Sequence, residues 1–197
     1  VLNAGHLSRY GDPDNPSFKQ KVYTLEREFA AYSGVKHCVA VNSGTGSLYI
    51  ALRALDIGHG DEVIVPAYTF VASYTATIFA GATPVLAEID ESFTLDPGDI
   101  ENRITERTKA IMPVHMLGNP SDLDAICGIA GKHGLYVVED SCQAAGASYK
   151  GRKIGSIGDI GGFSLNFHKT ITSGDGGLVV TDDDELYWRA FAIHDQG

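Results

Sequence analysis

Lys169 is the side chain of this sequence with the clearest potential for chemistry. It lies in a stretch of apolar and small residues that ends in the glycine-rich turn 174–177. A lysine withdrawn from water has a lowered pKa, and its neutral amine is a nucleophile that attacks aldehydes. Ser164, five residues earlier, could reach a phosphate carried by the same ligand. For a lone lysine, the default interpretation is a solvated loop residue.

A carboxylate offers a partner for such a ligand. Asp140 ends the nearly all-apolar run 135–140, and a buried carboxylate costs free energy unless it is paired. The pyridinium nitrogen of pyridoxal phosphate (PLP) is a suitable cationic partner, because a protonated ring nitrogen strengthens the electron sink. Gln143 could donate to the ring hydroxyl. The alternative is a helix start, with Asp140 as N-cap and Gln143 completing a capping box.

Two further segments could hold a phosphorylated ring. In the turn 42–47, Gly44 and Thr45 precede a predicted helix, and the N–H groups of a helix start favour an anion. The alternative is an ordinary N-cap with glycines for a tight turn. The turn matches neither the GxGxxG fingerprint nor a P-loop. Phe70 follows the apolar run 62–66 and could either stack on a planar ring or fill the core.

Two histidines lie near these segments. His115 follows the apolar run 110–114. We expect it to be a packed histidine, with a ligand contact as the weaker alternative. His168 directly precedes Lys169, and adjacent side chains usually point apart, so we expect a structural role for it.

Short apolar runs alternate with helical patterns along the whole chain. This order predicts an α/β fold in which a mostly parallel sheet has helices on both faces. Ligands then bind beyond the carboxyl ends of the strands, which is where the residues above lie. The predicted strands are 38–42, 62–66, 84–89, 110–114, 135–140, 160–165 and 177–181, and the predicted helices are 17–33, 45–55, 70–80, 121–133 and 184–194.

Composition narrows the possible partners. The chain of 197 residues has a net charge of −10, so we expect no nucleic-acid partner. No apolar run has membrane-spanning length. The acidic run 182–185 is typical of a helix start. The three cysteines lack metal-site spacing, which predicts no metal site and free, buried thiols in a reducing cytoplasm.

The segments together resemble the DegT/StrS family of PLP-dependent sugar aminotransferases, which have PLP fold type I. The resemblance is carried by residues 41–45, 60–66 with Phe70, 138–140 with Gln143, Phe163-Ser164 with Lys169, and 174–177. Each piece alone is unspecific, but their order and spacing are specific. The resemblance implies that residues 1–197 are the PLP-binding large domain, the N-terminal part of a longer chain whose small C-terminal domain is missing.

The resemblance also implies roles for single residues. Lys169 would form the internal aldimine and then shuttle protons. Asp140 would pair with the ring nitrogen, and Phe70 would stack on the ring. The phosphate would be held by Gly44, Thr45 and Ser164.

The implied activity is transfer of an amino group from glutamate or glutamine to a keto-sugar, often nucleotide-linked, in a cytoplasmic homodimer that serves polysaccharide or antibiotic-sugar synthesis. Because family sites lie at a dimer interface and draw on the missing region, we expect the fragment alone to be poorly active. Two alternatives stay open: a non-catalytic or regulatory relative, and a PLP-dependent sugar dehydratase. Relatives of the second kind replace the lysine by histidine, so Lys169 favours aminotransfer. Residues 141–142 and 166–168 depart from the family pattern.

Overall fold

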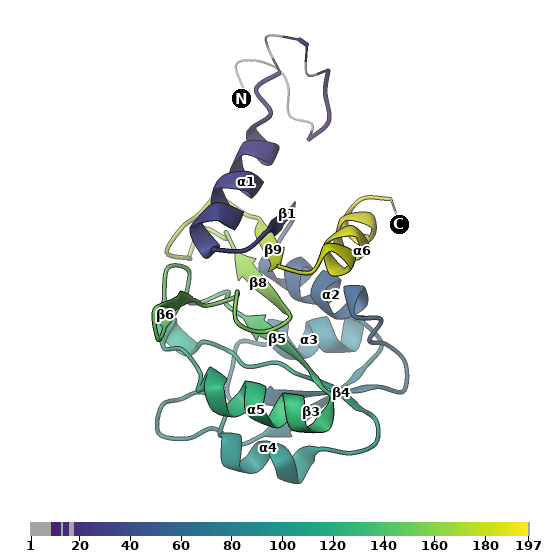
Figure 1. Ribbon diagram of the computed structural model, residues 1–197, viewed down its shortest axis with the longest axis vertical. Helices are drawn as coiled ribbons and strands as arrows, with labels where there is room; N and C mark the ends of the chain where they lie inside the picture. Colours follow the sequence, from purple (N-terminus) through teal and green to yellow (C-terminus); the bar gives the residue numbers. More distant parts are fainter. Residues whose placement is uncertain (1–8, 13, 16–17, 197) are drawn as a thin grey trace.

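A sheet of seven strands, in the order β1–β9–β8–β5–β4–β2–β3, is the centre of the computed structural model, which describes residues 9–12, 14–15 and 18–196 (Figure 1). The strands are β1 (His37–Val41), β2 (Glu62–Pro66), β3 (Thr83–Ala87), β4 (Thr108–Ile111), β5 (Tyr136–Asp140), β8 (Ile160–Ser164) and β9 (Gly177–Thr181).

The sheet is mostly parallel, as predicted. Strands β3, β2, β4, β5 and β8 pair in parallel, and β9 runs antiparallel to both of its neighbours, β8 and β1. All strands except β9 therefore end at one edge of the sheet. The chain segments that follow β1, β2, β4, β5 and β8 meet at this edge, which is where an open α/β sheet binds its ligands.

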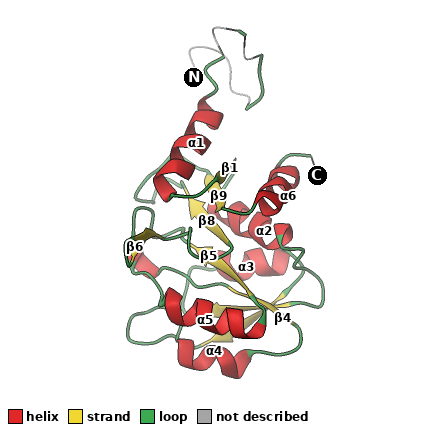
Figure 2. Ribbon diagram, viewed as in Figure 1, coloured by secondary structure: helices red, strands yellow, loops and turns green. Residues whose placement is uncertain are grey.

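Helices cover both faces of the sheet (Figure 2). On one face, α2, α3 and α6 pack over a core that includes Val138 of β5. On the other face, the adjacent Val137 packs in a cluster with residues of α4 and α5, while α1 covers β8 and β9. The helices are α1 (Lys21–Ser33), α2 (Gly44–Ala54), α3 (Ala72–Phe79), α4 (Pro97–Arg103), α5 (Leu123–His133) and α6 (Asp184–His194).

Five elements differ from the sequence-based expectation. Helix α1 begins at Lys21 rather than at residue 17, because Gln20 has a left-handed backbone with φ 48°. Strand β4 covers 108–111 rather than 110–114, since Pro113 has no N–H to donate to a ladder. Helix α4 and the small hairpin of β6 (Ser148–Tyr149) and β7 (Arg152–Lys153) were not predicted. Their runs are too short to show a periodic pattern.

The acidic run 182–185 starts a helix, as predicted. Asp183 is the N-cap of α6, and its carboxylate accepts from the amides of Glu185 (2.7 Å) and Leu186 (2.9 Å).

The three cysteines are unpaired. Cys38 is buried as predicted, but Cys127 and Cys142 are partly exposed, so the expectation of buried thiols is wrong for these two. Across the described part of the chain, no helix combines the length and the apolar character needed to cross a bilayer.

Candidate active site

A cavity of about 600 Å³ at the carboxyl edge of the sheet brings together all the predicted site residues. Its walls come from the ends of β1, β5 and β8, the segment before α3, and the turn around Lys169. The predicted residues that line it are Gly44, Thr45, Phe70, Asp140, Gln143, Ser164 and Lys169. The remaining lining residues are Ser43, Ala72, Cys142, Asn166, Phe167, His168 and Asp175.

Asp140 presents a nearly buried carboxylate to this cavity. It is 4% exposed, and its Oδ2 accepts from the Ser73 hydroxyl (2.8 Å) while Oδ1 accepts from the Cys142 amide (3.1 Å). Both donors are neutral, and the described residues give Asp140 no ion pair. Because no helix follows β5, the capping-box alternative for Asp140 and Gln143 is wrong. The arrangement suits a cationic ligand atom.

Ser73 is a site residue that the sequence reasoning missed. It is fully buried in the first turn of α3, and its hydroxyl lies 3.1 Å from that of Thr69. Its partner, Asp140, is 67 positions away. A small polar residue in a helical run predicts no such contact, and only its position three residues after Phe70 could have drawn attention to it.

The turn before α2 contains an N-cap and leaves further amides that an anion could use. The Ser43 hydroxyl accepts from the Gly46 amide (3.0 Å), which confirms the N-cap interpretation. A helix start has several N–H groups without an intrahelical acceptor, however, and this cap satisfies only one of them. The amides of Gly44 and Thr45 can therefore still donate hydrogen bonds to a phosphate.

Gly44 allows α2 to begin directly against the end of β8. A Cβ atom at this position would lie 2.6 Å from the Ser164 Cβ and 3.0 Å from the Cys142 Sγ. The missing side chain thus lets the Ser164 hydroxyl lie next to the helix start, so that both can act on one anion.

Phe70 and Lys169 flank the open side of the cavity. The Lys169 Nζ lies 5.9 Å from the centre of the Phe70 ring. The ring is 63% exposed, so the alternative of a core aromatic is wrong. Lys169 is itself partly exposed. It is therefore less withdrawn from water than the sequence predicted.

Gln143 is oriented by a neighbouring loop. Its Oε1 accepts from the Leu117 amide (3.2 Å), which leaves the amide NH₂ as a donor towards the cavity. Leu117 is 80% exposed and has a left-handed backbone with φ 51°, an uncommon conformation for a residue with a side chain.

The predictions for the two histidines have different outcomes. His115 is completely buried and bonded to Glu139, so the expectation of a packed histidine is confirmed. His168 lines the cavity together with Lys169, so the structure places it at the site, whereas the sequence predicted a structural role. Residues 166–169 form a turn closed by the Lys169 amide and the Asn166 carbonyl (2.9 Å), and side chains on a turn do not alternate as they do on a strand.

Cys142 contributes a neutral wall to the cavity. Burial, followed by the nearby Asp140 carboxylate, holds the pKa of its thiol well above the ordinary value of 9.0. The neutral thiol therefore does not compete with Asp140 for a cationic ligand.

A second hollow of about 550 Å³ adjoins the first. The two share Phe70, Gln143, His168 and Lys169. Tyr68, Thr69, Met116, Leu117 and Thr170 complete the second hollow. A second molecule could therefore lie next to Lys169 while the first cavity is occupied.

The family model described as the DegT/DnrJ/EryC1/StrS aminotransferase family matches residues 16–197. The chain belongs to this family. Its members are PLP-dependent aminotransferases. Over 177 residues the chain is 48% identical to the GDP-perosamine synthase of Caulobacter vibrioides. The match covers 89% of this chain and 48% of the synthase.

Solved structures of other proteins have the same fold. An aminotransferase from Psychrobacter cryohalolentis superposes with a TM-score of 0.89 at 45% identity, covering 93% of this chain and 47% of the other. NtdA from Bacillus subtilis, solved with bound cofactor PMP, gives a TM-score of 0.87 at 34% identity, covering 98% of this chain and 42% of the other. The chain thus spans about half the length of the relatives it matches.

Proposed function

We propose that residues 1–197 are the PLP-binding large domain of a longer sugar aminotransferase, in which Lys169 is the reactive amine and Asp140 holds the ring nitrogen. The observation that carries this proposal is that both side chains line one cavity. The activity would move an amino group from glutamate or glutamine to a keto-sugar. The GDP-perosamine synthase among the relatives supports a nucleotide-linked substrate.

The described residues fit PLP. The cavity has the volume of a typical cofactor pocket. Asp140 offers a buried carboxylate, paired only with neutral donors, for a ring nitrogen. Gln143 has free donors for a ring hydroxyl. The phosphate would lie at the start of α2, held by Gly44, Thr45 and Ser164, and bound PLP would supply an aldehyde and an electron sink.

Lys169 and Phe70 would complete the reacting centre. Among the described residues that line the cavity, Lys169 is the only one with an amine. Its Nζ lies on one side of the Phe70 ring, and there it would accept a proton and return it. The exposed Phe70 face would stack on a planar ring and fix its height above the sheet.

The second hollow supports a two-substrate reaction. It opens beside Lys169 and is lined by Tyr68 and Leu117 as well as by residues of the first cavity. We propose that the amino donor and the keto-sugar occupy this space in turn.

We further propose a cytoplasmic homodimer. The unpaired cysteines support a reducing compartment. Large apolar side chains remain exposed around the cavity mouth, which supports a partner surface there. These side chains are Tyr68, Phe70, Leu117 and Phe167.

A PLP titration of the chain tests the assignment of Lys169. Wild type should develop a visible absorbance band that is absent in Lys169→Ala. Lys153→Ala is the matched control, because Lys153 also lies over an aromatic ring (4.7 Å from the Tyr32 centre) but outside the cavity. A band that survives in Lys169→Ala would refute the proposal. In the full-length protein, amino transfer to a panel of keto-sugar nucleotides should depend on Lys169 in the same way.

A further inference from the structure

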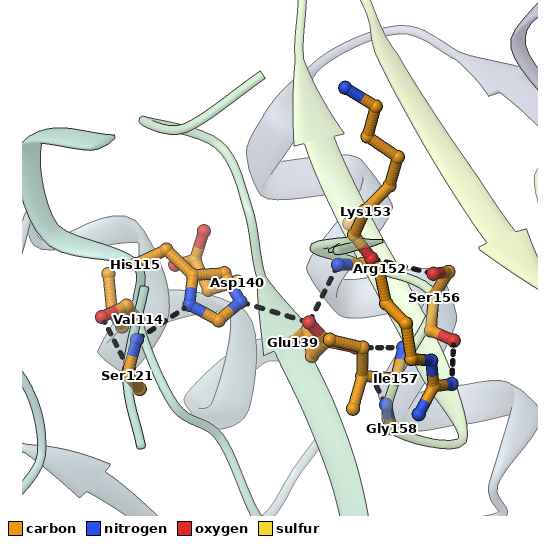
Figure 3. Close-up of polar contacts among 12 residues, drawn as sticks. Val114, His115, Ser121, Glu139, Asp140, Arg152, Lys153, Ser156, Ile157 and Gly158 are labelled. Carbon is orange, nitrogen blue, oxygen red and sulfur yellow. Dashed lines mark hydrogen bonds and ion pairs between the residues drawn. The ribbon is translucent and has the colours of Figure 1, made fainter. Parts of the chain in front are cut away.

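Glu139 and His115 form a completely buried pair next to the end of β5 (Figure 3). The His115 Nε2 lies 3.0 Å from the Glu139 Oε2, and neither side chain has any exposed surface. Glu139 directly precedes Asp140, and successive side chains of a strand point to opposite faces. Glu139 accordingly does not line the cavity.

Four donors converge on the Glu139 carboxylate. Besides His115, the amides of Gly155, Ile157 and Gly158 donate to it, each at 2.6 Å. Burial alone would raise the pKa of Glu139, but these hydrogen bonds, that of His115 first, bring it below its ordinary value of 4.5. The carboxylate is therefore an anion held by four converging hydrogen-bond donors.

The loop that supplies these amides is itself held in shape. The Ser156 hydroxyl donates to the Lys153 carbonyl (2.6 Å), and the Arg152 Nη2 donates to the Ser156 carbonyl (3.0 Å) (Figure 3). The amides thus point at Glu139 from a preformed loop.

The pair has a fixed direction of donation. The Ser121 amide donates to the His115 Nδ1 (3.1 Å), so Nδ1 is an acceptor and carries no proton. His115 must then be the neutral tautomer that donates from Nε2 to Glu139. A glutamine at 139 would aim an NH₂ group at a donor, whichever way it turned.

This pair is joined to the cofactor-facing residues by the backbone. The His115 amide donates to the Asp140 carbonyl (3.1 Å), and the Asp140 amide donates to the Pro113 carbonyl (2.9 Å). Leu117, two residues after His115, orients Gln143. On the other side, the loop 155–158 leads into β8, which pairs with β5 and ends at Ser164.

We propose that Glu139 and His115 are positioning residues that set where the Asp140 carboxylate lies relative to Gln143 and Ser164. This inference rests on the proposed function, since Asp140 is taken to hold the PLP ring nitrogen. One buried carboxylate joins β5, which carries Asp140, to the loop that orients Gln143 and to the loop that leads into β8 and Ser164. A shift of any of these segments would loosen the proposed contacts with the ring nitrogen, the ring hydroxyl and the phosphate.

Two variants test this role against a matched control. Glu139→Gln removes the charge and one acceptor. His115→Asn keeps an acceptor for the Ser121 amide and loses the donor to Glu139. The three hydrogen bonds from backbone amides to Glu139 stay in place. The control is Glu62→Gln, because Glu62 is also a buried, hydrogen-bonded carboxylate (4% exposed) but lies at the start of β2, at the opposite edge of the sheet.

Two measurements separate positioning from stability. The first is the PLP affinity, with the pH midpoint of the visible band. The second is hydrogen exchange of the Cys142 amide in the PLP-free chain, because this amide donates to the Asp140 carboxylate. Glu139→Gln and His115→Asn should weaken PLP binding about 10- to 100-fold, as loss of supporting contacts around a site does elsewhere. They should also speed Cys142 exchange, and Glu62→Gln should do neither.

A different pattern of results would overturn the inference. If both variants lose only stability, as Glu62→Gln does, and keep wild-type PLP affinity and Cys142 protection, the pair is structural and the inference is overturned. If Glu139→Gln does not fold, His115→Asn decides. A wild-type chain without a Lys169-dependent band would contradict the proposed function instead, and Cys142 exchange would still decide whether the pair positions Asp140.

Discussion

At the scale of single residues, Asp140 gives the proposed cationic ligand its clearest support. Two neutral donors and burial leave this carboxylate with unused acceptor capacity on its cavity side. Such a group is costly to the folded chain until a cation arrives, and it is therefore expected where binding requires it.

Asp140→Asn should weaken PLP binding while leaving the PLP-free chain equally or more stable. The amide can still accept from Cys142 and donate to the Ser73 hydroxyl, but it cannot pair with a protonated ring nitrogen. Loss of a charge-assisted hydrogen bond costs about 1.5–3 kcal/mol, or roughly 10- to 100-fold in affinity. PLP titration and urea unfolding without PLP measure the two effects. Unchanged affinity with lower stability would argue that Asp140 is only structural.

The stability of the fold should depend on the ionisation of Glu139 and therefore on pH. Its pKa lies below the ordinary value of 4.5 in the folded chain, so its ionised form stabilises the fold above that value. This stabilisation is lost as the pH falls through the lower, folded-state pKa. The stability difference between wild type and Glu139→Gln should thus be largest near neutral pH and shrink in acid. Urea unfolding at a series of pH values checks this, and a difference that does not change with pH would contradict it.

The sequence predicts some of these residues and not others, for a physical reason. Asp140, Gln143, Ser164 and Lys169 follow the ends of strands, and a parallel sheet brings such positions together whatever the details of packing. The contacts of Ser73 with Asp140 and of His115 with Glu139 join residues 67 and 24 positions apart. They depend on how a helix and a loop pack on β5, and no local pattern encodes that.

At the scale of elements, the close approach of α2 to β8 would create the proposed anion site. Helix α2 begins at Gly44, where the absent Cβ admits Ser164. The predicted bounds of α2 and β8 differ from the observed ones by one residue at most, because glycines and a serine N-cap mark where helices begin and end. The short α4 and the β6–β7 hairpin carry no such repeated pattern.

Gly44→Ala should damage both stability and phosphate binding. The new methyl group would overlap Ser164 and Cys142, and overpacking of this kind typically costs about 1–3 kcal/mol. Gly128→Ala is the matched control, since Gly128 lies within α5 with nothing near its missing Cβ. That change should stabilise the chain by roughly 0.5–1 kcal/mol. Thermal unfolding and competition of inorganic phosphate with PLP report the two effects, and a Gly44→Ala chain as stable as Gly128→Ala would show that the contact is not tight.

At the scale of the whole molecule, the cavity is well lined on the sheet side and open on the other. Phe70 and Phe167 are each more than half exposed at its mouth. The chain also spans about half the length of its relatives. The exposed mouth of the cavity fits the proposal that other parts of a longer protein complete the site.

Residues 1–197 alone should therefore bind PLP but turn over poorly, and the full-length protein should be an active dimer. Light scattering with size-exclusion chromatography gives the oligomeric state, and single-turnover assays with an amino donor give the rate. A fragment that transfers amino groups as fast as the full-length protein would show that the described cavity needs no completion.

Chemical trapping of the cofactor tests the central claim most directly. Borohydride treatment of the PLP-loaded chain, followed by peptide mass spectrometry, should place the pyridoxyl group on Lys169 alone, and Asp140→Asn should reduce the labelled fraction at limiting PLP. Label on another lysine such as Lys153, or label spread evenly over several lysines, would contradict the assignment of this cavity as the PLP site.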